Sequence, residues 1–509
     1  MSDDLHFDQL LTEDAAALPP SGAEVNPWRE AMCLVLWGLG LTTLTLNFLY
    51  LDIILPAVGA ILMVLGFRTL RRENRALQWC YRLSVAAAAV RSIAYTLNAL
   101  PWETGYVPAY VTILLTLALY VCLWRGMVGV SRAAGSEKPA APAAGALVIF
   151  YAVLIPLAYI GLEGWLAVLP LVIIYIVILR NLVKLSRSLA DTGYVVTAAP
   201  VRLPSRAVLW GYLGVTLAAI LLAMFLGQRY PMDWQPRADA PQDAAIRAEL
   251  LELGFPRDVL DDLTADEVAQ MAGAETVIAD TQYLYDTMQY RTVITDKWNQ
   301  EHNARWQYVS SEKQPDGSYR YTFHVYDNYQ RTLTSVAVGL PEEGGCQRWL
   351  ILHALHCDMP PERRYTECLR VIQPVWVSEG WEKGDLISGR VLCHRRGQPV
   401  TADFRQLGIT SASGGVWDFL WMGQTREQIT AVWSWPASGT ELRAYVLYDA
   451  LLPPQTRERS IVSWVDVLRQ RVPTYPFTGA DEMSDGWYSD KRERHQAWLE
   501  EPLPPATAE

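Results

Sequence analysis

Long hydrophobic segments alternate with short polar connections over the first 230 residues of the chain. A membrane-spanning helix needs about 20 mainly apolar residues to cross the hydrocarbon layer. Seven segments meet this need, although the second is short and a re-entrant first pair would reduce the count to six. The predicted spans are 31–50, 53–70, 77–100, 107–124, 145–162, 165–182 and 207–226.

After Tyr230 the pattern changes to short helical runs. A Pro- and Asp-rich linker, PMDWQPRADAPQ, leads into AAIRAELLEL, whose apolar residues recur at helical spacing up to Gly254. Glycine at that point suits a left-handed C-cap. Pro256 fits the first turn of a second short helix, and Thr264 with Glu267 predicts a capping box that opens a third. We therefore predict a compact helical segment that packs against a sheet.

From Tyr283 to about Asp449 the pattern is typical of antiparallel strands, because short alternating runs rich in Tyr, Trp, Val and Thr are separated by turn residues. The clearest hairpin is WQYVSSEKQPDGSYRYTFHVYD, in which Gly317 supplies the positive φ that the tip needs. These runs predict a β-sandwich or partial barrel with helices at its ends. The series continues with GRVLCHRRGQPVTADFRQL, GGVWDFLWMG, ITAVWSWPASG and ELRAYVLYDAL.

The predicted fold class is an α-helical transmembrane bundle of about seven spans followed by an α+β soluble domain. That domain is expected to be mainly an antiparallel β-sandwich or partial barrel with a short helical segment. The 509 residues are enough for several domains. The predicted parts are an acidic cytoplasmic tail (1–29), the transmembrane bundle (30–228), a linker (229–241), the short helical segment (242–275) and a β-rich extracytoplasmic domain with a C-terminal helical tail (276–509).

Charged residues in the hydrophobic region predict the orientation. Short cytoplasmic loops retain Lys and Arg, and the connections around Asp52, Glu103 and Glu163 contain neither. With seven spans, the N-terminus is expected in the cytoplasm and the C-terminal domain outside the plasma membrane. With six or eight spans, the C-terminal domain would lie in the cytoplasm instead. The basic residues lie in the second, fourth and sixth connections: Arg68, Arg71, Arg72, Arg75, Arg125, Arg132, Lys138, Arg180, Lys184, Arg187, Arg202 and Arg206.

The excess of acidic residues lies outside the hydrophobic region. The part after Tyr230 is about 14 units negative, within a chain of formal net charge −11. Nucleic-acid binding depends largely on Lys and Arg that neutralise phosphates, so we set a nucleic-acid partner aside. The N-terminus lacks the basic start and early apolar run of a cleavable signal, so the internal spans are expected to drive insertion into the lipid bilayer.

Two arginines lie inside the third predicted span, at Arg82 and Arg91. An ionisable group near mid-membrane is costly and normally faces a partner or a water-filled cavity. One interpretation is an anion or lipid-headgroup site, or a signalling switch. The other is an arginine that snorkels or bonds to Thr42, Thr43, Thr45 or Asn47 of a neighbouring helix. No Asp or Glu lies within a span, which weakens a proton relay.

Tryptophans give the main signal for a binding surface in the soluble half. Trp417, Trp421, Trp433 and Trp435 are expected to share one hairpin, with Trp433 and Trp435 on the same strand face. If exposed, they would stack on sugars or contact a protein, and if buried, they would form a large aromatic core. They are the candidate ligand-binding residues.

The soluble half contains four cysteines, Cys346, Cys357, Cys368 and Cys393. In an oxidising compartment they could form two disulfides, with three possible connectivities, and otherwise they would pack as small hydrophobic thiols.

Other candidate chemistry is weak. His353, His356, Cys357, Cys393 and His394 include possible zinc ligands, but the spacing is unsuitable, since His353 and His356 would point to opposite faces of a strand. We predict no metal site and no cofactor. Ser310 and Lys313 match a Ser-x-x-Lys spacing, yet they precede a hairpin tip rather than lie on a helix.

Two stretches carry resemblances. LLELGFPRDVLDDL superficially resembles the loop of ubiquitin-associated domains over about 15 residues, and it departs where Leu263-Thr264 interrupts the second helix. Together with RAYVLYDA, SIVSWVDVLRQ and a Tyr-Pro turn, it also resembles uncharacterised multi-pass membrane proteins of Gram-positive bacteria with a C-terminal extracytoplasmic β-rich domain. The second resemblance implies an architecture and no catalytic residue.

These observations predict a membrane-anchored extracytoplasmic binding or sensory protein, not an enzyme. Its expected partner is an envelope component or another membrane protein. Two alternatives stay open: a transporter or lipid-handling membrane protein that uses the intramembrane arginines, and an extracytoplasmic hydrolase whose catalytic residues come from distant parts of the chain.

Overall fold

The computed structural model divides the chain into two compact units, one made of residues 1–98 and 102–223 and the other of 99–101 and 224–509. The acidic tail predicted over 1–29 lies almost entirely outside the described residues. The structure describes residues 27–503 except 44–49, 103–106, 136–139, 161–164, 192–198, 200–202, 238–242, 286–289, 299–305, 327–328, 362, 378–379, 413–425, 455, 457–459 and 483–491.

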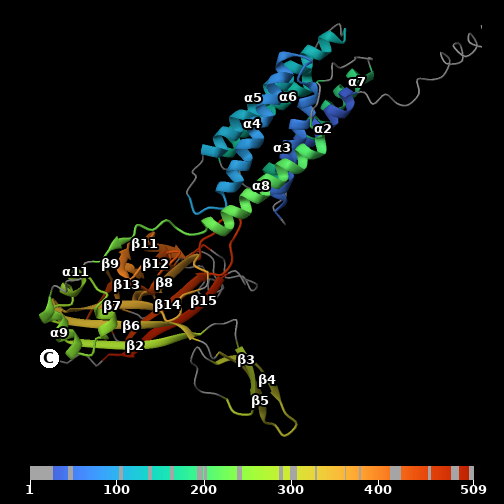
Figure 1. Cartoon of the computed structure of the whole chain (residues 1–509). Helices are drawn as coiled ribbons and strands as arrows, with labels where there is room; N and C mark the ends of the chain where they lie inside the picture. The colour runs from blue at the N-terminus through green and yellow to red at the C-terminus, as the bar shows by residue number, and fades with distance from the viewer. Residues whose placement is uncertain are drawn as a thin grey trace, which may run out of the picture. The chain divides into compact units, whose positions relative to one another are not determined.

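The first unit is helical, and its helices fall on the hydrophobic segments of the sequence (Figure 1). Each helix satisfies its own backbone hydrogen bonds, which an apolar environment requires. The helices are α2 (Pro27–Thr43), α3 (Leu51–Leu70), α4 (Arg75–Leu97), α5 (Val107–Ala133), α6 (Pro142–Ile160), α7 (Trp165–Asp191) and α8 (Ser205–Gly227).

Within the described part, four of these helices are long and apolar enough to cross a membrane, so the predicted count of seven spans is not supported. The described part of α2 has 17 residues, α4 contains Arg75, Arg82 and Arg91, and the apolar part of α6 is short. The four candidates are Leu51–Leu70, Tyr110–Ala133, Leu169–Leu189 and Ser205–Gly227.

Glycines allow α2 and α3 to approach closely. A Cβ added at Gly59 would lie 2.8 Å from the carbonyl oxygen of Gly38, and one at Gly66 would lie 2.6 Å from that of Ala31. Both distances are too short for a real side chain. Small residues at such contacts let helix backbones pack without an aqueous hydrophobic effect.

The second unit contains the predicted helical segment, and the structure has short helices where the local signals predicted them. Helix α9 (Ala244–Glu252) ends before Gly254, which has φ of 95°. Helix α10 (Arg257–Leu260) follows Pro256, and α11 (Ala265–Ala269) opens with the Thr264–Glu267 capping box. These local signals are correct because each depends on residues within one turn.

Three antiparallel sheets form the rest of the second unit. The first has the order β1-β10-β9-β13-β7-β6-β2, the second β11-β12-β8-β14-β15 and the third β3-β5-β4. The strands are β1 (Gln235–Pro236), β2 (Thr276–Tyr285), β3 (Tyr290–Thr295), β4 (Trp306–Lys313), β5 (Tyr319–Tyr326), β6 (Tyr329–Glu343), β7 (Cys346–Cys357), β8 (Thr366–Ile372), β9 (Glu382–Arg395), β10 (Gln398–Ala402), β11 (Gln406–Ala412), β12 (Arg426–Ser434), β13 (Thr440–Leu452), β14 (Ser460–Gln470) and β15 (Arg492–Pro502).

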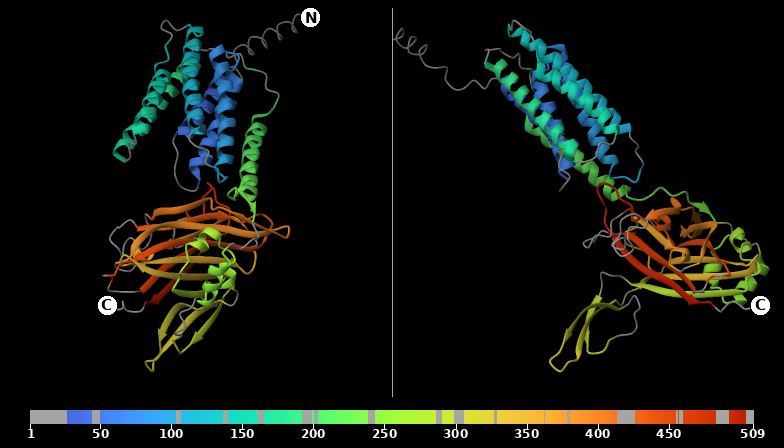
Figure 2. Two further views of the ribbon diagram at one scale, coloured as in Figure 1. Left: turned by 90° about the vertical axis from the view of Figure 1, so that its left-hand side faces the viewer. Right: turned by 180° about the vertical axis from the view of Figure 1, so that it is seen from behind.

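The two larger sheets pack face to face, since one hydrophobic core contains buried residues of both (Figure 2). Ile351 and Val446 contribute from the seven-stranded sheet, and Val371 and Val465 from the five-stranded one. The end strands β1 and β2 pair on one side only, so the sheet does not close into a barrel. The arrangement is an open sandwich.

The helical segment covers the outer face of the seven-stranded sheet. Leu250, Phe255 and Leu260 join a second core with Val336 and Leu447 of that sheet. This confirms that the helical segment packs against a sheet.

The predicted C-terminal helical tail is wrong over the described residues. SIVSWVDVLRQ forms β14, and Arg492–Pro502 forms β15, which pairs with it in antiparallel register. Strand β14 also pairs with β8, and this long-range pairing decides its conformation.

Candidate functional site

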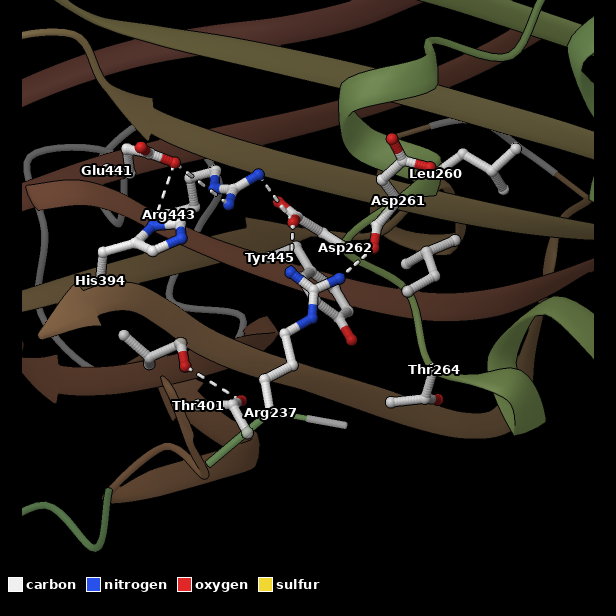
Figure 3. Close-up of polar contacts among 12 residues, drawn as sticks. Arg237, Leu260, Asp261, Asp262, Thr264, His394, Thr401, Glu441, Arg443 and Tyr445 are labelled. Atoms are coloured by element: carbon white, nitrogen blue, oxygen red, sulfur yellow. Dashed lines mark hydrogen bonds and ion pairs between the residues drawn. The ribbon is translucent and has the colours of Figure 1, made fainter. Parts of the chain in front are cut away.

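A polar cluster lies where the helical segment meets the seven-stranded sheet (Figure 3). Asp262, just after α10, accepts from Arg237 at 3.2 Å and pairs with Arg443 of β13 at 2.8 Å. Burial raises the pKa of the Asp262 carboxyl, although both arginines act in the opposite direction. The cluster therefore joins three segments of the chain around one buried carboxylate.

Glu267 makes a second connection between α11 and the sheet. Its carboxylate accepts from the Tyr445 hydroxyl at 2.6 Å, from the Thr264 amide at 2.9 Å and from Ser388. Burial, and then the charge of Glu267, raise the pKa of Tyr445 well above its ordinary value. Both carboxylates pair with groups of the protein that lie on other segments, so they act to hold the helical segment in place.

A cavity of about 260 Å³ opens elsewhere on this unit. Its walls come from the segment after α8, from β9, from β10 and from the connection to β11. Polar and charged side chains dominate the lining, and Phe404 and Met232 add apolar surface. The lining residues are Pro231, Met232, Asp233, Gln235, Arg390, Thr401, Ala402, Asp403, Phe404 and Arg405.

The small sheet β3-β5-β4 contains an aromatic cluster on one face. Phe323 of β5 is buried and has Trp298, Trp306 and Tyr308 around it, with ring centroids 5.8, 5.7 and 6.1 Å away. Tyr321 adds a further contact with Trp298 at 5.1 Å. A three-stranded sheet needs such a hydrophobic face for its own stability.

The rim of this aromatic cluster faces solvent. Trp298, Tyr308 and Tyr319 expose 43%, 46% and 45% of their surface. Tyr319 is stacked on Tyr321 with an interplanar angle of 24°. Large aromatic side chains gathered on an exposed sheet are unusual for a surface that contacts only water.

Two buried polar networks link the sheets of the sandwich. His353 of β7 contacts the hydroxyls of Ser335 at 2.8 Å and of Ser463 at 2.9 Å, and Ser463 contacts the Tyr448 hydroxyl at 2.7 Å. Burial lowers the pKa of His353 to about 3. The imidazole is therefore neutral, and it lies in the core.

The second network is an ion pair between Arg331 of β6 and Glu367 of β8, at 2.9 Å, with Arg469 of β14 3.9 Å from the same carboxylate. Arg331 and Glu367 are 3% and 1% exposed. Like the histidine network, it connects the two sheets.

The exposed aromatic surface predicted at the four tryptophans needs correction. Trp433 and Trp435 do share a face, but that face is the sandwich core, where the two rings lie 5.6 Å apart and are 0% and 1% exposed. The alternative of an aromatic core is therefore correct for this pair. Trp417 and Trp421 lie outside the described residues.

The sequence left two disulfides and free thiols as alternatives for the four soluble cysteines. Cys346, Cys357 and Cys393 are free thiols, which leaves too few partners for two bridges. Cys346 and Cys357 are at opposite ends of β7, while Cys368 is buried in β8. Burial raises the pKa of Cys357 to about 12 and of Cys393 to about 11, which favours inert thiols.

The intramembrane arginines have local contacts. Arg91 donates to the carbonyl oxygen of Pro56 in α3 at 2.9 Å, and the Arg82 guanidinium lies 5.0 Å from the centre of the Trp79 ring. The predicted hydrogen bond from Arg91 to a threonine hydroxyl is absent at Thr42 and Thr43. The Thr42 hydroxyl donates to the Gly38 carbonyl oxygen, and the Thr43 hydroxyl accepts from Tyr175.

The remaining candidate residues lie apart. Register puts His353 opposite Val446 in the core, whereas His356 pairs with Arg443 on the outer face. Among the described residues, no group of three or more potential metal ligands occurs. Ser310 pairs with Thr322 and Lys313 with Tyr319, so their side chains point to opposite faces of the small sheet.

The aromatic sheet and the cavity were both missed from the sequence. The alternation in YRYTFHVY places Tyr319, Tyr321 and Phe323 on one face, which was a signal for the first. No local pattern marks the cavity, because its walls are far apart in the sequence.

Neither a protein-family model nor a curated protein matches this chain.

Proposed function

We propose that this chain is a membrane-anchored binding or sensory protein whose β-rich unit contacts an envelope component outside the cell. The observation that carries the proposal is the exposed rim of the aromatic cluster, formed by Trp298, Tyr308 and Tyr319. Tyr and Trp give large contact areas with little loss of side-chain entropy, and each also has a polar group for hydrogen bonding.

The architecture fits this proposal. Four helices have the length and composition of membrane spans, and the proposal extends membrane crossing to all seven helices α2 to α8. Basic residues then gather at alternate connections, with Arg68 in the last turn of α3, Arg71 and Arg72 after it, and Arg187 near the end of α7. This alternation supports a cytoplasmic N-terminus and an extracytoplasmic β-rich unit. It is also the arrangement of the Gram-positive membrane proteins that the sequence resembles.

The alternatives have less support. A transporter or lipid-handling protein would use Arg82 and Arg91, whose contacts with Trp79 and Pro56 already account for their positions. A hydrolase would need a nucleophile and a base beside a cavity. The cavity near Arg390 is lined by no serine, cysteine or histidine, so its lining contains no Ser-His or Cys-His pair.

Cosedimentation of the purified full-length chain, in detergent, with isolated cell-envelope material tests the proposal. The variant combines Trp298→Ala, Tyr308→Ala and Tyr319→Ala, which removes the rim and leaves Phe323 in place. We expect binding to fall by about tenfold or more, as for the loss of central aromatic contacts in other interfaces.

A matched control combines Thr292→Ala with Ile294→Ala on the opposite face of the same sheet, where both side chains are exposed. The control should bind as the wild type does. If wild type and rim variant sediment equally, the aromatic rim is not the contact surface and the proposal loses its main support.

A further inference from the structure

The cavity lined by Arg390 has a wall that continues directly from α8. We name residues 228–237, between α8 and the helical segment, the connecting segment. At its start Gln228 is buried and accepts from the Thr474 amide at 2.7 Å and the Gln470 side chain at 3.0 Å. At its end Gln235 pairs with Thr401 of β10, and Arg237 bonds to Asp262.

The middle of the connecting segment lies outside the sheet, and its Met232 and Trp234 pack against the sandwich core. Pro231, Met232 and Asp233 contribute to the cavity lining and belong to no helix or strand. The opposing wall is built on β9 and β10 and is therefore fixed by sheet hydrogen bonds. A molecule bound in the cavity would contact both walls.

Three charged residues of the lining, Arg390, Asp233 and Asp403, do not pair with one another. Within the described part of the chain, Arg390 and Asp403 make no hydrogen bond or ion pair through their side chains, and Asp233 accepts only from Gln235, at 3.3 Å. Charged groups that line a concave site without partners are available to a ligand.

The balance of charges indicates what kind of ligand fits. The guanidinium of Arg390 alone would favour an anion, but Asp233 and Asp403 lie in the same lining and would repel it. A molecule that presents both signs satisfies both sets of groups. The volume of about 260 Å³ lies just below the range usual for drug-sized ligands, so the ligand is small.

We propose that this cavity binds a small zwitterion, in which a carboxylate and an ammonium group are a few bonds apart, as in a free amino acid. The guanidinium of Arg390 holds the carboxylate, and the carboxylates of Asp233 and Asp403 hold the ammonium group. The buried ring of Phe404 contacts the apolar part of the ligand. This site is separate from the aromatic rim and does not depend on its function.

Thermal unfolding and calorimetric titration of the full-length chain in detergent test the site. The probes are a panel of free L- and D-amino acids, with acetate, methylammonium and inorganic phosphate as probes of single charge. We expect at least one amino acid to bind saturably and to raise the unfolding temperature. Acetate, methylammonium and phosphate should have no such effect at equal concentration.

Variants assign the binding to this cavity. Arg390→Gln and Asp403→Asn should each weaken binding by about tenfold or more, since each removes a charge-assisted hydrogen bond. Asp403 is exposed, so its variant tests the site even if Arg390→Gln disturbs folding. Arg395→Gln, at an exposed position of β9 outside the cavity, should bind as the wild type does.

Three results would overturn the proposal: no amino acid binds, phosphate binds as tightly as any amino acid, or Asp403→Asn retains full affinity. The rim variant with Trp298, Tyr308 and Tyr319 changed to alanine should keep amino-acid binding, which separates this site from the envelope contact.

Discussion

His353 is a buried histidine whose protonation opposes folding of the sandwich. It is held by Ser335 and Ser463, on different sheets, and burial lowers its pKa to about 3. In the unfolded chain a histidine has a pKa of about 6.5. Between these values the unfolded chain binds the proton more readily, so folding becomes less favourable as the pH falls.

The prediction is that His353 contributes stability above about pH 6.5 and that this contribution is lost as the pH falls toward about 3. The loss has a slope of up to about 1.4 kcal/mol per pH unit. His353→Gln, which can still bond to both serines but does not titrate, should flatten the profile. The measurement is the stability of the full-length chain by chemical unfolding at pH 7, 6, 5 and 4.

His356→Gln, on the opposite face of β7, is the control. If it leaves the pH dependence of stability unchanged, the flattening in His353→Gln belongs to His353 and not to the loss of any histidine. Equal slopes for wild type and His353→Gln would mean that another group controls the acid response.

For single residues, the sequence predicts which face of a strand a side chain occupies, but it does not predict whether that face is buried. The alternation of side chains along a strand correctly predicted that Trp433 and Trp435 share one face. It does not show which face of the strand is covered by another sheet. The same limit applies to Tyr308 and Tyr319, which lie on the exposed rim of the small sheet. Burial is decided by contacts between distant strands, so it needs the fold.

Among the elements, the helical segment is the part that the sequence predicts best. The Gly254 C-cap and the Thr264–Glu267 capping box are satisfied by groups within a few residues, so a local pattern is sufficient. The attachment of that segment to the sheet depends on Tyr445 and Ser388, which are far away in the sequence, and no local pattern predicts it.

This attachment gives a prediction for Glu267→Ala. The change removes the partners of Tyr445, Ser388 and the Thr264 amide together, and it leaves a buried hydroxyl without an acceptor. We expect the local stability of residues 244–271 to fall by about 1–3 kcal/mol. Hydrogen exchange followed by mass spectrometry should show faster exchange there, while the β7–β13 pair keeps its protection.

Glu252→Ala, at an exposed position of α9, is the control and should exchange as the wild type does. Unchanged exchange in Glu267→Ala would mean that hydrophobic contacts of Phe255 and Leu260 alone hold the segment to the sheet.

For the whole molecule, the sequence identified a hydrophobic helical part and an acidic β-rich part, because composition and period differ sharply between them. It did not identify the cavity, whose walls include Asp233 and Arg390 from separate segments. It also gave a span count of seven, whereas four helices among the described residues have the required length and hydropathy. Orientation depends on that count, since each added or removed span reverses the side of the C-terminal unit.

Labelling of introduced cysteines in intact cells measures the orientation directly. Ser311→Cys lies on the exposed β4, and Ser188→Cys lies at an exposed position near the end of α7. With seven spans we expect a membrane-impermeant reagent to modify Cys at 311 and not at 188, read by mass spectrometry at each site. Cys33, which is exposed, supplies the background of native labelling.

The reverse pattern would place the β-rich unit in the cytoplasm, and with a cytoplasmic N-terminus it would mean an even number of spans. The aromatic rim at Trp298, Tyr308 and Tyr319 would then contact a cytoplasmic partner, and the zwitterion in the Arg390 cavity would come from the cytoplasmic pool. Labelling at both positions only after the cells are opened would give the same result for the β-rich unit. The chemistry of the two sites would be unchanged, because it depends on the contacts within the β-rich unit and not on the compartment that it faces.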